Sequence, residues 1–434
     1  MPTPQSTPLY RDRPGGFDIQ PAHQSEARKI LDGIYLSEGL SNSFLIVTPE
    51  GRVVINTGMG FEAPVHKRLY DAVDRSPLRY ILLTQGHVDH VGGVDQLREP
   101  GTEIVAHANQ ASQQDDDERI KGFRAARSAF AFRDAIAKIL RHARAHADEP
   151  VPAQSRPEAT LTFDDWHAFE LGGQRFELLS VPGGETADSM AIWLPDRKIC
   201  FSGNLFSALF GHFPNLVTIR GDRYREAPRF IESLERVRAL EPEWLMVGHG
   251  LPIRGRDLIQ SELIRLRDAV EYVHAATVEG MNAHKDVHTL MREIQLPPEL
   301  EVGEGYGKVS WSVRAIWETY AGWFHHRSTT ELYAIPAEAI HGDLVELAGG
   351  PDAITARARQ RLESGEPVEA IHLAEVVLSA APFDRGALQV SIEAHARLDA
   401  ESVNFWLSSW LREQGRSLGE RLELAEKKRS EEGA

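Results

Sequence analysis

The sequence predicts an α/β domain followed by a separate all-α domain. The chain has 434 residues, more than one hydrophobic core usually serves, so two domains are expected. From about Ile34, short β-type runs alternate with helical stretches, and these strand patterns disappear after roughly residue 335. We therefore expect an N-terminal arm over residues 1–30, the α/β domain over 31–280, a connecting segment over 281–335 and the all-α domain over 336–434.

Turn residues delimit the first strands of the α/β domain. Residues 43–47 and 53–55 have strand composition, and Pro49-Glu50-Gly51 forms the turn between them. Helical spacing over residues 64–74 leads to a buried strand at 80–84, which opens onto a histidine-rich loop. A polar loop at the carboxyl end of a strand is where open α/β folds place their chemistry.

The second half of this domain begins with a long helical stretch over residues 110–150. Its acidic residues come first and its arginines later, an order that suits the helix dipole and indicates a solvated face. Further strands are expected at 176–181, 190–194, 199–201 and 244–247, and helices at 227–240 and 257–279. The strand at 244–247 runs into Gly248-His249-Gly250, so a second histidine follows the carboxyl end of a strand.

Composition narrows the class of partner. The formal net charge of −16 argues against binding to nucleic acid or to an anionic membrane surface, so we expect a small-molecule partner. Cys200 is the only cysteine, which excludes an internal disulfide framework and a cysteine-rich zinc module. Residues 1–20 contain no apolar run and no later stretch reaches transmembrane length, so a cytoplasmic protein is expected.

The segment Thr84 to Gly93 carries the strongest chemical signal. His87, Asp89 and His90 lie within four residues on a loop that leaves a strand, and such crowding is costly unless a cation binds the three side chains. The alternative is a polar surface loop with chance histidines. His249 is less distinctive alone, since a Gly-His-Gly sequence can be an ordinary turn. Asp89, His90 and His249 together predict a three-ligand zinc site with one open position, the arrangement of catalytic zinc.

Several segments resemble the metallo-β-lactamase superfamily, and in particular its alkyl sulfatase branch. The histidine loop is similar to the superfamily signature His-x-His-x-Asp-His, with Gln85 in place of the first histidine. Residues 181–187 resemble a Pro-Gly-Thr-Glu-Ala segment in which the glutamate, here Glu185, binds metal. Residues 201–204 align with a bridging carboxylate, and residues 215–221 resemble an Asn-Leu-x-Thr-x-Arg-Gly segment. The resemblance covers about residues 30–415.

This resemblance implies a fold and an assembly. It implies an αββα sandwich followed by an alkyl sulfatase dimerisation domain, without the sterol-carrier-like third domain of the full-length family. A homodimer formed through the C-terminal helices is therefore expected. Trp406, Trp410 and Leu411 have helical spacing and are candidates for the dimer interface, with intramolecular core as the alternative.

Three departures from the family pattern weaken the predicted metal site. Gln85 replaces an imidazole with a neutral amide, Asn204 or Gly203 replaces the bridging carboxylate, and Asn56 replaces the aspartate of an Asp-Thr-Gly turn. The first metal position then keeps His87 and Glu185, with Gln85 and Asn204 as weaker candidate ligands. One firmly held zinc is our first expectation and a weakly filled second position comes next; manganese and iron are not excluded.

The predicted activity is that of a metal-dependent hydrolase that uses a metal-activated water. The resemblance favours a sulfate ester of an alkyl or aryl alcohol as substrate. Asp89, Glu185 and Arg220 are the candidate catalytic residues, Glu185 as a general base and Arg220 as a clamp on an anionic group. The alternatives are a capping or surface acid for Glu185, and a surface salt-bridge cluster for Arg220 together with Arg223 and Arg225.

Two other functions stay open at this point. One is a metallo-hydrolase of a carboxylic ester, lactone, amide or phosphate ester, and the other is a non-catalytic binding protein on a degenerate site. Phe206, Phe210 and Phe213 either line a substrate cleft or belong to the core.

Overall fold

The computed structural model describes residues 7–145 and 151–432. It divides into two compact units, of which the first ends at Tyr320 and the second begins at Ala321. The boundaries predicted from the sequence at residues 30, 280 and 335 stay predictions.

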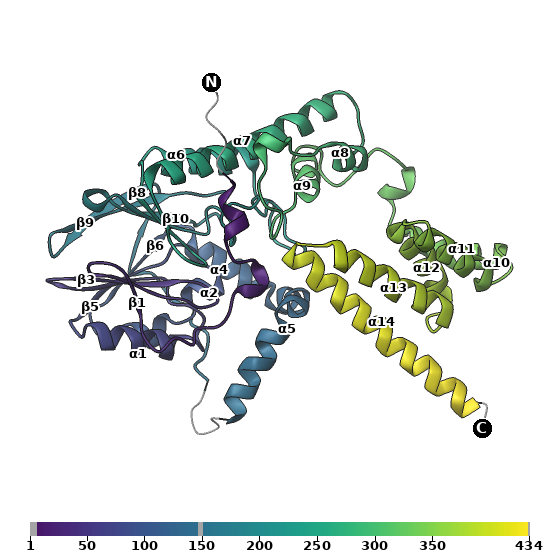
Figure 1. The fold of residues 1–434 in the computed structure, drawn as a ribbon, viewed down its shortest axis with the longest axis horizontal. Coiled ribbons are helices and arrows are strands. Elements are labelled where there is room, and N and C mark those ends of the chain that lie inside the picture. Colours follow the sequence, from purple (N-terminus) through teal and green to yellow (C-terminus); the bar gives the residue numbers. More distant parts are fainter. Residues whose placement is uncertain (1–6, 146–150, 433–434) are drawn as a thin grey trace. The chain divides into compact units, whose positions relative to one another are not determined.

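The first layer of the first unit is a seven-stranded sheet whose strands follow sequence order. Figure 1 shows this sheet, with β1, β3 and β5 labelled, beside the second sheet, with β8, β9 and β10 labelled. Neighbouring strands are antiparallel from β1 to β4 and parallel from β4 to β7. The switch matters because the parallel strands end at one edge, and that edge carries the histidine-rich loop. The strands are β1 (Arg28–Leu31), β2 (Ile34–Ser37), β3 (Ser43–Thr48), β4 (Gly51–Ile55), β5 (Leu78–Leu82), β6 (Glu103–His107) and β7 (Leu161–Phe163).

The second layer is a six-stranded sheet in the order β13-β12-β11-β10-β9-β8. Only β11 and β12 pair in parallel, so their carboxyl ends also meet at one edge. Its strands are β8 (Trp166–Leu171), β9 (Gln174–Ser180), β10 (Met190–Leu194), β11 (Ile199–Gly203), β12 (Trp244–Val247) and β13 (Ile253–Arg254). One apolar core joins the two sheets, with Leu36 and Phe44 from the first and Phe176 and Phe201 from the second.

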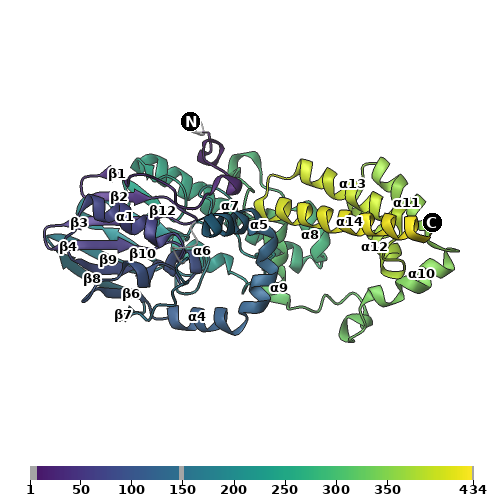
Figure 2. The ribbon, with the colours of Figure 1, turned by 90° about the horizontal axis from the view of Figure 1, so that it is seen from below.

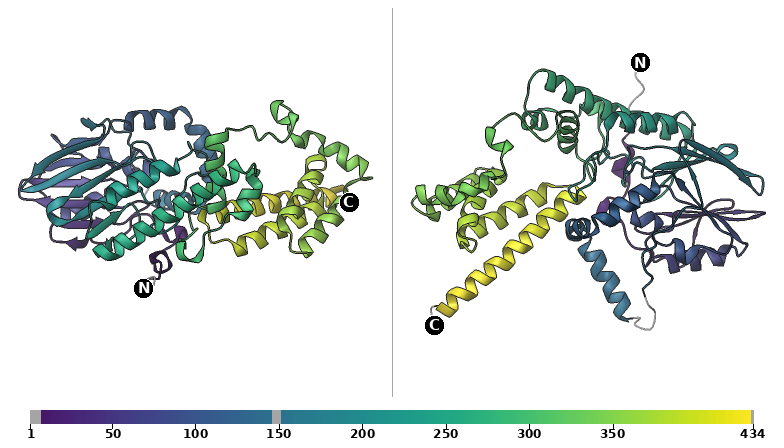
Figure 3. Two further views of the ribbon diagram at one scale, coloured as in Figure 1. Left: turned by 90° about the horizontal axis from the view of Figure 1, so that it is seen from above. Right: turned by 180° about the vertical axis from the view of Figure 1, so that it is seen from behind.

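Helices cover the outer face of each sheet, as two further views show (Figure 3). On the first sheet, α1 (Ala63–Val73) and α3 (Val94–Leu97) pack against β3, β4 and β5. On the second, α6 (Ala227–Arg238) and α7 (Arg256–Asn282) form the outer core together with α8 (Val287–Glu293) and α9 (Val309–Ala321). The order helix, sheet, sheet, helix confirms the predicted αββα sandwich followed by a helical region.

Two helical predictions differ in detail from the structure. Helix α7 continues through Gly280 and ends at Asn282. Gly280 therefore does not end the helix; it makes room for Leu290, whose Cδ2 would lie 2.2 Å from a Cβ at this position. The single stretch expected at 110–150 is two helices, α4 (Gln110–Arg119) and α5 (Lys121–Ala145), which meet at Ile120 (Figure 2). Residues 146–150 of that prediction lie outside the described residues.

The apolar stretch between the predicted site motifs is core. Phe206, Phe210 and Phe213 are at most 3% exposed and pack with the helices behind the second sheet. They therefore line no cleft. Short 3-10 turns complete this unit: η1 (Leu9–Asp12), η2 (Gly16–Asp18), η3 (Pro195–Arg197) and η4 (Pro298–Leu300).

The described part of the second unit contains helices and no strands. Its elements are η5 (Thr329–Leu332), η6 (Ala337–Ile340), α10 (His341–Leu347), α11 (Pro351–Glu363), α12 (Pro367–Ala380), α13 (Arg385–Glu401) and α14 (Phe405–Glu432). Ala374, Leu388 and Leu418 join α12, α13 and α14 in one core. Trp406 and Leu411 are buried, which agrees with the alternative that they belong to the intramolecular core. Trp410 is 43% exposed. In the described residues, no helix has both the length and the apolar character needed to cross a membrane.

Candidate metal centre

Four loops at the carboxyl ends of strands bring the predicted site residues together. The loop after β5 carries Gln85 and His87 and continues into the short helix α2 (Val88–Val91), which holds Asp89 and His90. Glu185 follows β9, Asn204 follows β11 and His249 follows β12. All of these side chains except Asp89 are at least nine-tenths buried, so the site lies inside the edge of the sandwich.

Hydrogen bonds from loops beside the first sheet fix the backbone of the histidine loop. The amide and hydroxyl of Thr57 donate to the carbonyl of His90 over 2.8 and 3.1 Å. The Ser41 hydroxyl donates to the carbonyl of Asp89, and the Gln154 amide donates to the carbonyl of Val88 over 2.6 Å. Backbone carbonyls on both sides of the site residues are thus held, which leaves their side chains free to converge.

Asn42 fixes the loop that carries His249. Its backbone amide donates to Gly248 over 2.7 Å, and its side-chain amide donates to the carbonyls of Val247 and Gly250 over 2.8 and 2.7 Å. The sequence analysis did not single out Asn42, Ser41 or Thr57, because polar residues beside strand ends give no distinctive pattern until the partner strands are known.

Asp89, His90 and His249 form a group with metal-binding geometry. One ligand atom from each lies within 4.8 Å of the others, and no other group of this kind occurs among the histidine, cysteine and carboxylate side chains that the structure describes, in residues 7–133 and 151–431. Asp89 Oδ2 lies 3.5 Å from His90 Nε2 and 3.8 Å from His249 Nε2. Tetrahedral zinc with bonds of 2.0–2.1 Å requires ligand atoms about 3.3 Å apart, so small shifts suffice.

Two side-chain amides contact the predicted ligands of the metal positions, and Asn204 contacts ligands of both. Asn204 Nδ2 lies 2.9 Å from Glu185 Oε2 and within 3.1 Å of Nε2 of both His90 and His249. Gln85 Nε2 lies 3.3 Å from the same Glu185 oxygen and 3.1 Å from His87 Nδ1. Glu185 is therefore held by hydrogen-bond donors where the pattern has cations. In this orientation the amides fit a first metal poorly, because the nitrogens that face Glu185 have no lone pair to offer and the neutral oxygens, which do, are weaker ligands than a carboxylate or an imidazole.

Two glycines lie beside Asn204 for different reasons. Gly248 makes room for the amide, since a Cβ there would lie 2.0 Å from Asn204 Oδ1. Gly203 makes room for Thr84, whose Oγ1 would lie 2.6 Å from a Cβ, and its φ of 52° is in the left-handed region that glycine adopts without strain.

Asn56 has a structural role at the end of β4. Its Oδ1 accepts from the backbone amide of Thr84 over 2.9 Å and its Nδ2 donates to the Thr84 hydroxyl over 2.9 Å. It thereby ties β4 to the start of the histidine loop, and it does so in the left-handed region, with a φ of 57°.

Burial and charge shift the ionisation of the site in opposite directions. Burial lowers the pKa of His90 to about 4, which favours the neutral imidazole that a metal ligand requires. Burial raises the pKa of Asp89, but the imidazoles of His90 and His249 outweigh it and the pKa lies below its usual value. Burial also opposes ionisation of Glu185, yet the contact with His87 and the charge of Arg225 hold its pKa well below the usual range.

The three arginines have different surroundings. Burial lowers the pKa of Arg220, but the charges of Tyr306, Glu185 and Asp222 outweigh it and the pKa is raised. Arg225 is buried, donates to the carbonyl of Asn215 and lies 3.7 Å from Asp222. Arg223 is 82% exposed and pairs with Asp116 on α4. It therefore forms a surface ion pair, the alternative given for it in the sequence analysis.

Comparisons with known proteins agree with this architecture. A model described as the metallo-beta-lactamase superfamily matches residues 36–249, and one described as alkyl sulfatase dimerisation matches residues 286–417. The chain belongs to the metallo-β-lactamase superfamily. Within that superfamily it belongs to the alkyl sulfatase-like branch and carries the branch's dimerisation domain.

The relatives are sulfatases of modest identity. A linear primary-alkylsulfatase of a Pseudomonas species is 26% identical over 84% of this chain and 72% of its own length. An alkyl/aryl-sulfatase of Saccharomyces cerevisiae is 23% identical over 88% of this chain, which spans 62% of that protein. A solved stereoselective inverting sec-alkylsulfatase from a Pseudomonas species has a TM-score of 0.77 at 20% identity, covering 92% of this chain and 65% of the other, and shows the fold. Family and relatives together support a hydrolase.

Proposed function

We propose that the protein is a metal-dependent hydrolase with one firmly held ion, and that its substrate is a sulfate ester of an alkyl or aryl alcohol. The observation that carries the proposal is the Asp89–His90–His249 group, whose ligand atoms lie within 4.8 Å of one another at the edge where the strands end. Zinc suits two imidazoles and a carboxylate; manganese and iron are the alternatives. A zinc ion on these ligands supplies an activated water and neutralises charge that develops on the ester oxygen.

The chain's own residues support a single ion. Gln85 and Asn204 donate to Glu185 Oε2 over 3.3 and 2.9 Å, so this carboxylate is satisfied without a second cation. All of these contacts use Oε2, so Oε1 would be the atom available to an attacking water. The lowered pKa of Glu185 keeps it ionised, and in that form it would act as the general base.

Arg220 is the group that holds the sulfate. A guanidinium presents planar donors that match the oxygens of an anion, and Arg220 lies on the side of the site that carries Glu185 and Asp222. The linear primary-alkylsulfatase and the alkyl/aryl-sulfatase among the relatives make a sulfate ester the first choice of anion. A second candidate is a hydrolase of carboxylic or phosphate esters. The amides Gln85 and Asn204 favour it, because a site with one ion instead of two need not keep the substrate preference of the sulfatases.

The experiment measures metal content and product release on the same preparation of the full chain. Sulfate release from hexyl sulfate and 4-nitrophenyl sulfate is compared with hydrolysis of 4-nitrophenyl acetate and 4-nitrophenyl phosphate. His249→Ala should abolish both metal and activity. Arg220→Gln should raise KM for the sulfates and leave the neutral acetate unchanged, while Arg256→Gln, an exposed arginine paired with Glu241, should change neither. Hydrolysis of the acetate or phosphate alone would support the second candidate.

A homodimer is the second part of the proposal. The dimerisation model matches residues 286–417, and the described second unit exposes large apolar side chains, among them Leu347 at 84% and Tyr333 at 69%. Apolar surface of this kind is expected to be covered by a partner. Light scattering on the eluting protein distinguishes a dimer from a monomer of 48.4 kDa.

A further inference from the structure

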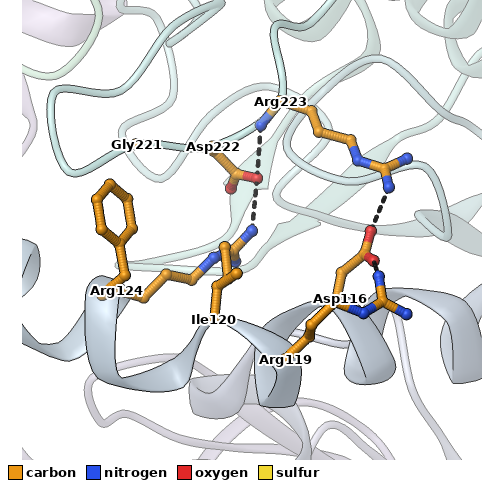
Figure 4. A pocket seen from close by; sticks show the side chains of 8 residues that line it. Asp116, Arg119, Ile120, Arg124, Gly221, Asp222 and Arg223 are labelled. Carbon is orange, nitrogen blue, oxygen red and sulfur yellow. Dashed lines mark hydrogen bonds and ion pairs between the residues drawn. The ribbon is translucent and has the colours of Figure 1, made fainter.

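A pocket of about 390 Å³ lies between the α4–α5 helices and the segment that follows Arg220 (Figure 4). Its volume is within the range of sites that hold small organic molecules. Asp116 and Arg119 on α4, Ile120 between the helices, Phe123 and Arg124 on α5, and Gly221, Asp222 and Arg223 on the opposite side line it. None of these residues belongs to the proposed metal site.

Ion pairs and hydrogen bonds hold the two sides of the pocket together. Arg127 on α5 donates to the carbonyls of Arg220 and Ile219 over 2.9 and 2.7 Å. Arg124 pairs with Asp222 over 3.0 Å, and Arg223 pairs with Asp116 across the opening. Figure 4 shows these last two contacts joining the helix to the loop. These contacts fix the distance between the two walls, so the pocket is a defined part of the first unit.

The pocket adjoins the metal site through Asp222. This carboxylate is 8% exposed and forms the inner wall of the pocket, while its Oδ2 lies 3.9 Å from Nε2 of His87. A substrate at the metal site thus has the pocket beside it, across Asp222.

The lining indicates the chemistry of the occupant. Ile120 and Phe123 are 40% and 57% exposed and give the pocket apolar surface. Arg119 and Arg223, 69% and 82% exposed, both pair with the single carboxylate of Asp116, whereas Arg124 pairs with Asp117 and Asp222. Arg119 and Arg223 are therefore the exposed guanidiniums at the rim. Apolar surface beside two exposed guanidiniums fits an organic group that is apolar near the ester and anionic at its far end.

We infer that this pocket binds the alcohol part of the substrate, and that the preferred alcohol carries a carboxylate at its far end. The inference rests on the proposed function. Ile120 and Phe123 contact the apolar part, and Arg119 and Arg223 pair with the carboxylate. The pocket therefore selects sulfate esters of hydroxy acids over esters of neutral alcohols.

Binding of two matched alcohols to the full chain tests the inference without any turnover. The probes are 4-hydroxyphenylacetate and its neutral amide 4-hydroxyphenylacetamide, which differ in charge and little in shape, and calorimetry measures both affinities. The acid should bind about three- to tenfold more tightly than the amide, since a charge-assisted contact at a solvated rim adds up to about 1.4 kcal/mol. The double variant Arg119→Gln, Arg223→Gln should remove this difference and leave the amide unchanged, whereas Phe123→Ala should weaken both.

Controls separate this inference from the proposed activity. Arg256→Gln, which removes an exposed arginine outside the pocket, should leave both affinities as they are. Equal binding of acid and amide, binding of neither, or a double variant that behaves like the parent would overturn the inference. If charge-dependent binding is present but the sulfate esters of the two alcohols are not hydrolysed, the sulfatase assignment fails and the pocket stands.

Discussion

Replacing Asn204 with aspartate places a second carboxylate beside Glu185. The Asn204 nitrogen now lies 2.9 Å from Glu185 Oε2, and two unit charges at that separation repel by about 6 kcal/mol at an effective dielectric constant of 20. The chain can avoid this by taking up a proton. Because His90 Nε2 and His249 Nε2 lie within 3.1 Å of the same atom, an imidazole is the cheapest group to protonate.

The cost of that proton sets the expected loss of stability. Burial lowers the pKa of His90 to about 4, so protonating it costs about 5 kcal/mol at pH 8 and about 4 kcal/mol at pH 7. With chelator present, Asn204→Asp should therefore lower the free energy of unfolding by up to about 5 kcal/mol at pH 8. For a unit of about 300 residues this corresponds to a drop in Tm of about 8 °C.

Added zinc should reverse the loss. A cation between the carboxylate of Glu185 and the carboxylate introduced at position 204 replaces repulsion by attraction, so metal content should rise above that of the parent and Tm should recover. Thermal unfolding at pH 7 and pH 8, with chelator and with zinc, measures each step. The exposed control Asn282→Asp adds the same charge at the end of α7 and should show neither effect. An Asn204→Asp variant that is as stable as the parent in chelator at pH 8, and gains no metal, would refute the view that this amide replaces a bridging carboxylate.

Three further outcomes follow from the structure. Gln85→His should raise metal content, because it restores an imidazole beside Glu185; unchanged content in metal analysis would exclude Gln85 as a cause of the single ion. Burial lowers the pKa of His66 to about 4, so the folded chain keeps it neutral while the unfolded chain protonates below about 6.5. About 3 kcal/mol of stability is then present above pH 6.5 and lost as pH falls towards 4; His66→Gln should flatten this dependence in urea unfolding, and His23→Gln, at an exposed site, should not. Leu347→Glu should convert the dimer to a monomer in light scattering with unchanged circular dichroism, and a dimer that persists would place the interface elsewhere.

The sequence alone predicted the sandwich because its strands are short, buried and delimited by turns. Residues 43–47 and 53–55 were expected as a hairpin and form β3 and β4 in antiparallel register. The histidine loop was predictable for the same reason, since it directly follows a buried strand. The edge strands β1 and β8 carry weaker patterns, with exposed residues along their length, and the sequence analysis did not identify them.

The sequence could not predict what surrounds the predicted ligands. Asn42 and Thr57 act through backbone carbonyls of segments distant in the chain, so only the packed fold brings them together with the loops they hold. The sequence analysis assigned Asp222 no role in the site, and the structure places it, buried, 3.9 Å from His87. The same holds for the amides of Gln85 and Asn204. Their residue types indicated lost metal ligands, but only the distances in the structure show that both donate to Glu185.

The central claim is that Asp89, His90 and His249 hold one ion per chain. Metal content by plasma mass spectrometry, on protein purified without a metal-affinity tag, tests it most directly. The account predicts about one equivalent, lost in His249→Ala and in Asp89→Ala and retained in Arg256→Gln. Near two equivalents would contradict the single-ion reading and mean that Gln85 and Asn204 serve a dinuclear site. No metal after incubation with zinc, manganese or iron would contradict the claim itself.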